Sequence, residues 1–409
     1  MNTTSTQNTS NTLALLWALG IAGFLVNADN RAVAPILTAI STDLAIHEST
    51  AGLLISAYSL PYGLFQLFYG PVADRIGKTR VILIALSLFS LGTVACGFTN
   101  NFTWLLALRV ITGVFAAGII PIALAQIGDS FPVAKRQNAI SFFMSFCMSG
   151  QALGIVIGAF LAQYYTWKTL FVLVGLAGIP AIFLLLRLRP TTVSPVAKKQ
   201  SSILPVYKAI LSKHSSRVVY LSVCLEGTIF WGGFTYLGVY ANMYLGLDFY
   251  LVGLFTASFS VAAFVGSRFI PAILKKVRQQ RMPALGVSLM ALAFALIGLI
   301  AHWMALLLGF ILLGVGFIVV HSTLQTYATE LLPEARGTCM SLFAFFLFLG
   351  NGIGPAFFGW VYDYGGVKIM LAVVTFCLVI FAYGCHIAFR NFNSQTATSR
   401  TQSNNKRSS

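Results

Sequence analysis

The stretch YGPVADRIGKTRVIL, residues 69–83, concentrates charge between two long apolar runs. Four charged side chains fall within seven consecutive residues of it, and they are Asp74, Arg75, Lys78 and Arg80. Lys and Arg that follow an apolar run of membrane-spanning length are typical of a loop on the cytoplasmic side of a membrane. The stretch therefore predicts two membrane helices joined by a short turn at the cytoplasmic face.

The composition places the whole chain in the membrane class. Of its 409 residues, 57% are hydrophobic and only 9% are charged, and the mean hydropathy is +0.83. A soluble domain carries about 25% charged residues. The net charge of +16 would suggest nucleic acid in a soluble protein, but cytoplasmic loops rich in Lys and Arg explain it here. We therefore expect membrane lipids, and no nucleic acid, as partners.

A membrane helix needs about 20 apolar residues, and a scan at that length predicts twelve spans and an all-α membrane protein. The longest gap, residues 188–217, is rich in Pro, Ser and basic residues and is expected to be a cytoplasmic linker between two six-helix halves, 13–187 and 218–390. Residues 1–12 and 391–409 are expected to be disordered cytoplasmic tails. The expected spans are 13–38, 50–73, 81–99, 103–127, 138–163, 168–187, 218–245, 251–274, 282–301, 303–329, 337–362 and 367–390.

The basic residues give these spans an orientation. With both chain ends in the cytoplasm, all but five of the 26 Lys and Arg residues fall on the cytoplasmic side. Of those five, Lys168 and Lys368 lie on the other side, and Arg31, Arg109 and Arg268 lie inside spans. This asymmetry predicts a multi-pass protein of a bacterial-type cytoplasmic (inner) membrane with both termini cytoplasmic.

The two halves repeat one another at an offset of 200 to 201 residues. GLLISAYS (52–59) aligns with GLFTASFS (253–260). In the same way Gly150 aligns with Gly350, and Gly154 with Gly354. Parallel six-helix repeats are a transporter architecture in which the substrate site lies between the halves near the middle of the membrane.

In this topology the opening stretch could act as a latch between the halves. Asp74 lies at the cytoplasmic end of the second span, close to where the eleventh span begins, and a helix N-terminus favours a nearby carboxylate. Gly70 would let two backbones approach closely, and Gly77 would allow a tight turn. Arg75 and the later basic residues would anchor the loop at anionic lipids. The alternative is that the stretch only sets the topology.

The residues GPVADRIGKTR (70–80) resemble the loop signature of the major facilitator superfamily. The twelve spans, the long central loop and the repeat extend this resemblance over the whole chain. The equivalent loop of the second half differs, because Lys275 stands where Asp74 does. The resemblance implies the major facilitator fold, with two pseudo-symmetric halves, and we expect a monomer.

Two further stretches resemble motifs of the twelve-helix bacterial drug:proton antiporters. LALRVITGVFAAG (106–118) resembles the motif with a buried Arg followed by Gly, although Thr112 replaces a Gln that is usual there. GQALGIVIGA (150–159) resembles the antiporter motif of the fifth helix, but Ile155 replaces its Pro and Ala159 its last Gly. The form with Pro appears instead in GNGIGPAFFG (350–359). The expected helix-packing glycines are Gly150, Gly154, Gly158 and Gly354.

Ionisable side chains at membrane depth are costly and are usually functional. Asp29 and Arg109 lie at depths that agree within about 5 Å, and the family resemblance places the first and fourth spans side by side. We therefore expect Asp29 to carry the coupling proton and Arg109 to regulate it. Arg31 lies about 200° around the helix from Asp29. It either lines the substrate cavity or extends outward to the membrane surface.

Further residues are candidates for the substrate cavity. An ion pair between Glu226 and Arg268 is favoured over a substrate role for either residue. His321 is expected to be a hydrogen-bonded packing residue, with a proton relay as the alternative. Trp231 and Phe234 share one helix face and could line a pocket for planar ligands, and aromatic rings facing lipid are the alternative.

These observations favour a proton-coupled secondary transporter, an exporter (antiporter) of small organic molecules or drugs that works by alternating access. Export of an endogenous anionic metabolite or siderophore is an alternative, because three buried arginines stand against two clear buried acids. A proton-coupled uptake symporter is another alternative, and a transporter-like sensor or lipid-handling protein is the alternative from a different class. The sequence shows no catalytic motif, phosphate-binding loop or metal-ligand spacing, so we expect no enzyme, cofactor or metal site.

Overall fold

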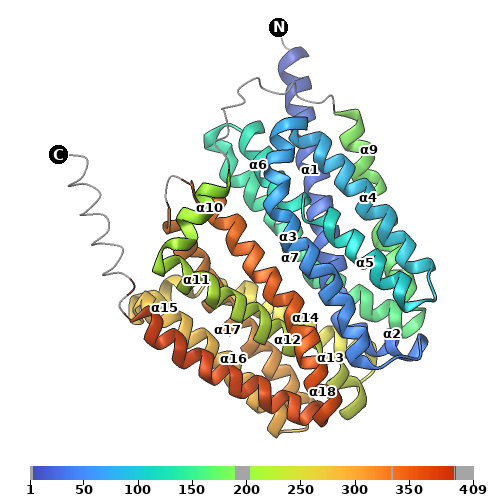
Figure 1. Cartoon of the computed structure of the whole chain (residues 1–409). Coiled ribbons are helices and arrows are strands. Elements are labelled where there is room, and N and C mark those ends of the chain that lie inside the picture. The colour runs from blue at the N-terminus through green and yellow to red at the C-terminus, as the bar shows by residue number, and fades with distance from the viewer. Residues whose placement is uncertain (1–2, 189–202, 333–334, 391, 393–409) are drawn as a thin grey trace, which may run out of the picture.

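The computed structural model describes residues 3–188, 203–332, 335–390 and 392. Over these residues the chain is almost entirely helical and contains no strand. Eleven helical stretches are long and apolar enough to cross a membrane. Figure 1 shows them gathered into two bundles, one formed by the first half of the chain and the other by the second half.

The N-terminal half contains six spans, three of which continue through short breaks in the helix. Its elements are α1 (Thr3–Ala32), η1 (Ala34–Ile36), α2 (Leu37–Asp43), α3 (Glu48–Ile76), α4 (Lys78–Phe98), α5 (Phe102–Ala116), α6 (Ile119–Ser130), α7 (Val133–Tyr164), α8 (Trp167–Leu176) and α9 (Ile179–Arg187). The first span runs from α1 into α2, the fourth from α5 into α6, and the sixth from α8 into α9.

The C-terminal half begins with the short α10 and then repeats the plan. Its elements are α10 (Ile203–Ser212), α11 (His214–Leu225), η2 (Glu226–Trp231), α12 (Gly232–Thr235), α13 (Leu237–Val239), η3 (Tyr240–Tyr244), α14 (Phe249–Ser267), α15 (Ile270–Lys276), η4 (Gln279–Arg281), α16 (Met282–Leu299), α17 (Trp303–Glu330) and α18 (Arg336–Phe389).

The helix α18 accounts for two of the twelve predicted spans. It has 54 residues, which is about 80 Å at 1.5 Å per residue and far more than one bilayer requires. Gly366 interrupts it with φ 71° and ψ 179°, a backbone conformation that glycine adopts without strain. The chain therefore turns back at Gly366, as the orange and red limbs of α18 show in Figure 1.

The N-terminus departs from the expected disordered tail, because α1 begins at Thr3. Adding residues to an existing helix costs far less than nucleating one, so the apolar span from Leu13 onward extends its helix into the polar residues before it. Part of the expected linker is also helical, as α10. The linker residues 189–202 and the tail residues 393–409 lie outside the described part of the chain.

The predicted small-residue face of the fifth span packs closely against the first span. A Cβ added at Gly154 would lie 2.5 Å from the Cα of Ala28, and one added at Gly158 would lie 3.0 Å from the Cβ of Ala32. Gly150 contacts the backbone of Phe24 in the same way. The spacing of four residues on both helices lets α7 and α1 approach at backbone distance, as small residues do in membrane helices.

The C-terminal half repeats this contact between its own first and fifth spans. Gly354 of α18 faces the backbone of Thr228 and Gly232. Because Gly154 faces Ala28 and Gly354 faces Thr228, the offset of 200 residues holds for both partners. The repeat in the sequence is therefore also a repeat in the packing.

The two halves meet through α3 with α18 and through α7 with α14. The rings of Tyr62 and Phe348 lie 4.2 Å apart at the first interface. At the second, the amide of Phe249 donates to Gln163 Oε1 at 2.9 Å. We call the end of the bundle that holds the N-terminus and the loop 75–80 the basic face, and Phe249 and Gln163 lie at the opposite face. Figure 1 shows the two bundles diverging toward the basic face.

Candidate functional site

A buried ion pair joins the first and fourth spans. Arg109 Nη1 on α5 donates to Asp29 Oδ2 on α1 at 2.6 Å, and each side chain is only 1% exposed. The guanidinium of Arg109 also lies over the ring of Tyr58, 4.3 Å from its centroid. The structure thus brings together the two residues that the sequence singled out as a proton carrier and its regulator.

The ion pair leaves hydrogen-bonding groups on both partners unused. Asp29 Oδ1, Arg109 Nε and the hydroxyl of Tyr58 are buried and have no hydrogen-bond partner. A buried pair stabilises a fold only when its geometry is good and its remaining polar atoms are satisfied. This pair meets the second condition only in part. Ionisable groups at membrane depth are usually functional, so we treat the pair as part of a functional site.

Close packing holds both members of the pair in place. Gly154 presses on Ala28, which directly precedes Asp29 in α1. Gly113, one turn after Arg109, contacts the backbone of Tyr58. Thr112, the departure from the family motif, donates its hydroxyl to the carbonyl of Arg109 at 3.0 Å. The glycines of both motifs therefore set the positions of α1, α3 and α5 around the ion pair.

Arg31 points from the N-terminal half to the C-terminal half. Its Cζ lies 3.4 Å from the ring centroid of Trp231, so the guanidinium stacks on the indole. Arg31 is half-buried. The alternative in which Arg31 extends outward to the membrane surface is therefore wrong.

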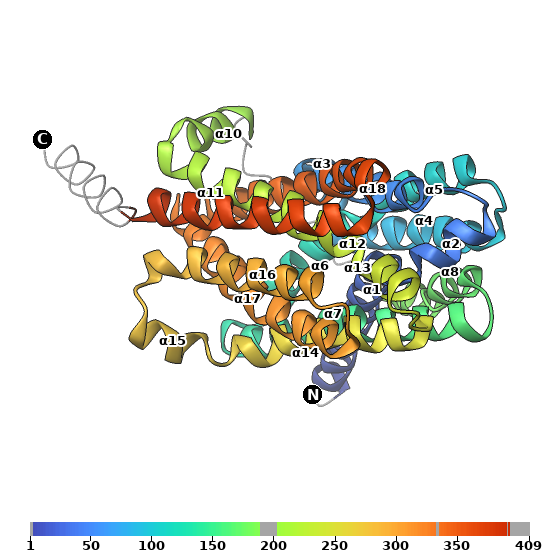
Figure 2. The same cartoon turned by 90° about the horizontal axis from the view of Figure 1, so that it is seen from below.

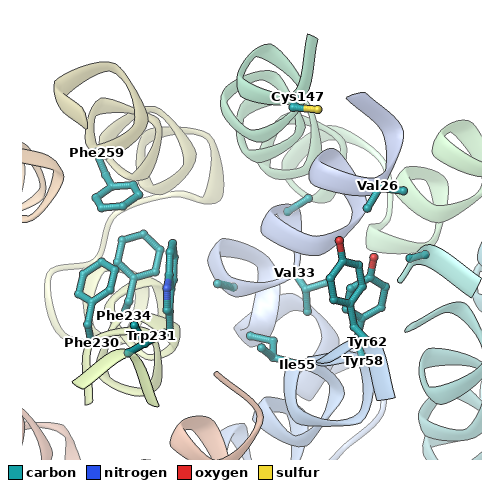
Figure 3. Close-up of a cluster of buried hydrophobic side chains, with 14 of the residues drawn as sticks. Val26, Val33, Ile55, Tyr58, Tyr62, Cys147, Phe230, Trp231, Phe234 and Phe259 are labelled. Atoms are coloured by element: carbon teal, nitrogen blue, oxygen red, sulfur yellow. The ribbon is translucent and has the colours of Figure 1, made fainter. Parts of the chain in front are cut away.

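Trp231 belongs to a dense aromatic cluster inside the C-terminal half. Its ring lies 5.3 Å from Phe234 and 5.7 Å from Phe259. Figure 3 shows Trp231 at the side of this cluster that faces the elements carrying Tyr58 and Tyr62. Both Trp231 and Phe234 are buried, so the alternative of rings facing lipid is wrong. Trp231 borders the interface between the halves, and Phe234 is part of the core behind it.

The seventh span changes its helical geometry at this cluster. Residues 226–231 and 240–244 form π-helical turns, a feature that occurs frequently at functional sites. The second view of the fold, in Figure 2, shows α12 and α13 close to α1. A Cβ added at Gly238 would lie 3.0 Å from Pro35 Cα in the N-terminal half. The adjacent glycines 232 and 233 lie in the short helix α12, between these two irregular segments.

The predicted ion pair between Glu226 and Arg268 is wrong. Glu226, which is fully buried, pairs with His321 Nδ1 at 3.1 Å instead. Arg268 caps the end of α14 with an exposed side chain that stacks on Phe264, 4.9 Å from the ring centroid. The reason is geometric, because Arg268 lies on the outer surface of α14, away from Glu226. His321 is a hydrogen-bonded residue packed 4.8 Å from the ring of Phe317, as the favoured expectation had it.

The residues of the opening stretch end α3 and begin α4. Gly77 has φ 95°, so glycine is needed for the turn. A Cβ added at Gly70 would meet no atom within 4 Å. The close backbone approach expected there is therefore absent, because the halves diverge toward the basic face. Asp74 and Arg75 are exposed at the end of α3, and their role as a latch stays a prediction.

The sequence analysis missed two equivalent hydrogen bonds between the halves. Asn351 Nδ2 donates to Ser59 Oγ at 3.1 Å, and Gln151 Nε2 donates to Ser260 Oγ at 3.1 Å. The signal was available, because Ser59 aligns with Ser260 and Gln151 aligns with Asn351 in the repeat. Each amide directly follows a packing glycine, Gly350 or Gly150, so the glycine contact fixes the amide at the interface.

Among the described residues, no three His, Cys, Asp or Glu side chains gather as metal ligands. The charged groups in the interior of the described bundles are instead the pair Asp29–Arg109 within the N-terminal half, the pair Glu226–His321 within the C-terminal half, and Arg31, which stacks across the interface. They lie on spans that the repeat makes equivalent, the first with the seventh and the fourth with the tenth.

Comparisons with known proteins agree with this architecture. The Major Facilitator Superfamily model matches residues 19–355. The chain is 26% identical over 374 residues to the uncharacterized MFS-type transporter YceJ of Bacillus subtilis, covering 90% of this chain and 93% of that protein. It is 25% identical over 376 residues to the quinolone resistance protein NorA of Staphylococcus aureus, covering 87% and 94% of the two chains.

The fold is also similar to that of solved transporters. A bacterial homologue of the human lysosomal transporter Spinster, in an inward-facing and unoccupied conformation, superposes with a TM-score of 0.79 at 19% identity, covering 94% of this chain and 98% of that one. The sequence match, the paired six-helix halves and the interface between them lead to one assignment. The chain belongs to the Major Facilitator Superfamily of membrane transporters.

Proposed function

We propose that this transporter is a proton-coupled exporter of small organic molecules that works by alternating access. The observation that carries the proposal is the buried pair of Asp29 and Arg109, held at 2.6 Å in the N-terminal half, two residues before the interface residue Arg31. A carboxylate in a poorly hydrated site favours its protonated form, whereas a guanidinium in contact favours the charged form. A change in the distance between the two groups would therefore change the proton affinity of Asp29.

The packing supports a mechanism that links this change to movement of the halves. The halves touch at the face opposite the basic face, where Gln163 accepts from Phe249. They diverge at the basic face, which the distribution of Lys and Arg would make cytoplasmic. The described arrangement would then be open to the cytoplasm, with Asp29 bound to Arg109. Arg31, two residues after Asp29, contacts Trp231 in the other half, so opening to the other side would shift α1 relative to α5 within the N-terminal half, separate the pair and let Asp29 take up a proton.

Export rather than uptake is supported by the antiporter-like motifs around Arg109 and Gly150. Similarity to the quinolone resistance protein of Staphylococcus aureus favours the same direction. In antiport, Asp29 would release its proton to the cytoplasm, and the substrate would then bind from the cytoplasm before the transporter opens to the other side. We place the protein in a bacterial cytoplasmic membrane, with both termini in the cytoplasm.

The test uses the purified full-length protein in liposomes with an imposed pH gradient and a trapped pH-sensitive dye. A quinolone and a series of aromatic carboxylates would be added as probes. The proposal expects at least one probe to dissipate the gradient while it moves against the direction of the proton. Probe movement that is unaffected by the gradient would contradict proton coupling, and movement in the direction of the proton would identify a symporter.

A further inference from the structure

Arg31 is a cation at the interface of the halves for which the described part of the chain offers no acidic partner. Asp29 is bound to Arg109 and Glu226 to His321. Among the described residues, no carboxylate lies within ion-pair distance of Arg31. A charged side chain at membrane depth is costly and is typically paired or functional. The charge of Arg31 is therefore available to an anion that the described residues do not supply.

The stacking of Arg31 determines how such an anion could bind. One flat face of the guanidinium lies on the ring of Trp231, at 3.4 Å from its centroid. A guanidinium carries its five N–H donors along its edge, so stacking leaves the fork that binds a carboxylate in a bidentate way. The indole holds the plane of Arg31 and reduces the freedom that would be lost on binding.

The surroundings of Arg31 suit an apolar body attached to the anionic group. Trp231 forms the border of the aromatic cluster, with Phe230 at 4.7 Å and Phe317 at 5.3 Å between ring centroids. The indole Nε1 of Trp231 is buried without an acceptor. On the other side of the interface Tyr58 and Tyr62 stack 5.7 Å apart. Aromatic side chains of both halves therefore surround the place where Arg31 crosses the interface, and the guanidinium and indole N–H groups there could donate to a charged group.

We propose that the transported molecule is an organic monoanion, a carboxylate on a planar apolar body, held by the edge of Arg31 beside Trp231. This inference deepens the proposed function and rests on it only in taking the interface as the substrate site. It assigns substrate binding to Arg31 and proton binding to Asp29. The competing account is that the stack of Arg31 on Trp231 only joins the two halves.

Binding to the purified full-length protein separates these accounts without any need for transport. The probes are benzoate and 1-naphthoate, with benzamide and 1-naphthamide as neutral analogues of the same shape. The readouts are tryptophan fluorescence, repeated with Trp231→Phe, and equilibrium dialysis of labelled probe. We expect the carboxylates to bind saturably and their amides at least about tenfold more weakly, as is typical when a charged hydrogen bond is lost.

The variants identify the group that binds the anion. Arg31→Met should weaken carboxylate binding by about tenfold or more, and Arg31→Lys should weaken it less because the charge remains. Arg268→Met is the matched control, since it removes an exposed arginine on α14, and should leave binding unchanged. If the stack of Arg31 on Trp231 is purely structural, Arg31→Met should have a lower melting temperature than the wild-type protein but the same relative affinities for acids and amides.

Two results would overturn the proposal. One is failure of both carboxylates to bind the wild-type protein, and the other is equal binding of acids and amides. The proposed function is tested independently of this inference, because Asp29→Asn should lose proton coupling but still bind the carboxylates. Anion binding by a wild-type protein that shows no proton coupling would contradict only the proposed function, and coupling in a wild-type protein without anion preference would contradict only this inference.

Discussion

Arg31 and Trp231 occupy equivalent positions in the two halves, 200 residues apart, and they stack on one another at 3.4 Å. A residue that touches its own repeat partner lies close to the pseudo-twofold axis between the halves. This axis passes through the place where alternating access requires a substrate to be bound. The repeat therefore locates the centre of the transporter, while the difference between Arg and Trp gives the two sides of that centre different chemistry.

The packing of Gly154 on Ala28 predicts a large effect of added volume. Gly154→Leu should destabilise the protein by about 1–3 kcal/mol, as overpacking typically does, and should displace Asp29, the next residue of α1. The melting temperature and transport at matched membrane abundance measure both effects. Gly384→Leu is the control, because a Cβ there would meet no atom within 4 Å. Equal behaviour of the two variants would show that the α1–α7 contact is not needed.

The two equivalent hydrogen bonds predict coupling across the interface. Ser59→Ala and Asn351→Ala remove partners of the same bond, so their effects on the melting temperature should not add. Each loss corresponds to about 1 kcal/mol. Ser59→Ala combined with Gln151→Ala removes two separate bonds and should be additive. Additivity in both pairs would mean that the bond between Ser59 and Asn351 does not form in the membrane.

The pair of Glu226 and His321 predicts an asymmetry between single and double variants. His321→Gln would leave a buried carboxylate without its partner, and such breaking of a buried pair typically costs about 3–5 kcal/mol. The double variant with Glu226→Gln removes the charge as well and should be more stable than His321→Gln alone. Thermal unfolding in detergent compares them. A double variant that is less stable than either single one would contradict a structural role.

Asp74 predicts a defect in transport without a defect in insertion. Asp74→Asn should lower the transport rate several-fold, because the contact of a carboxylate with a helix N-terminus would be lost. Asp74→Glu keeps the charge and should retain more activity. Transport is compared at equal amounts of protein in the membrane. If Asp74→Asn transports at the native rate, residues 69–83 only set the topology.

Much of the fold could be predicted from the sequence, because a bilayer demands long apolar helices and leaves few other choices. The span boundaries, the repeat and the role of Gly77 in a turn all follow from local patterns. To predict the pairing of Asp29 with Arg109, it was also necessary to know that the first and fourth spans lie side by side, which the family resemblance implied. The helical breaks in the seventh span and the true partner of Glu226 could not be predicted, since they depend on which way each side chain points after packing.

Gly70 is another residue whose contacts could not be predicted from the sequence. A small residue predicts close approach, but whether two helices approach at that depth depends on the conformation of the whole transporter. In the sequence, the hydrogen bonds of Ser59 and Gln151 are indicated only by the alignment of these residues with Ser260 and Asn351 in the repeat. Their meaning required knowing that the fifth span of each half faces the second span of the other.

Uphill transport by Asp29→Asn tests the central claim most directly. The variant and the wild-type protein are compared in liposomes with an imposed pH gradient, using whichever probe the wild-type protein moves. Asp43→Asn is the matched control, because Asp43 lies on the same span but pairs with Lys168 at the opposite face, at 3.0 Å. The account predicts that Asp29→Asn exchanges substrate downhill but no longer accumulates it, while Asp43→Asn accumulates it normally. Accumulation by Asp29→Asn at the native rate would contradict the account and make Glu226 the next candidate for the proton site.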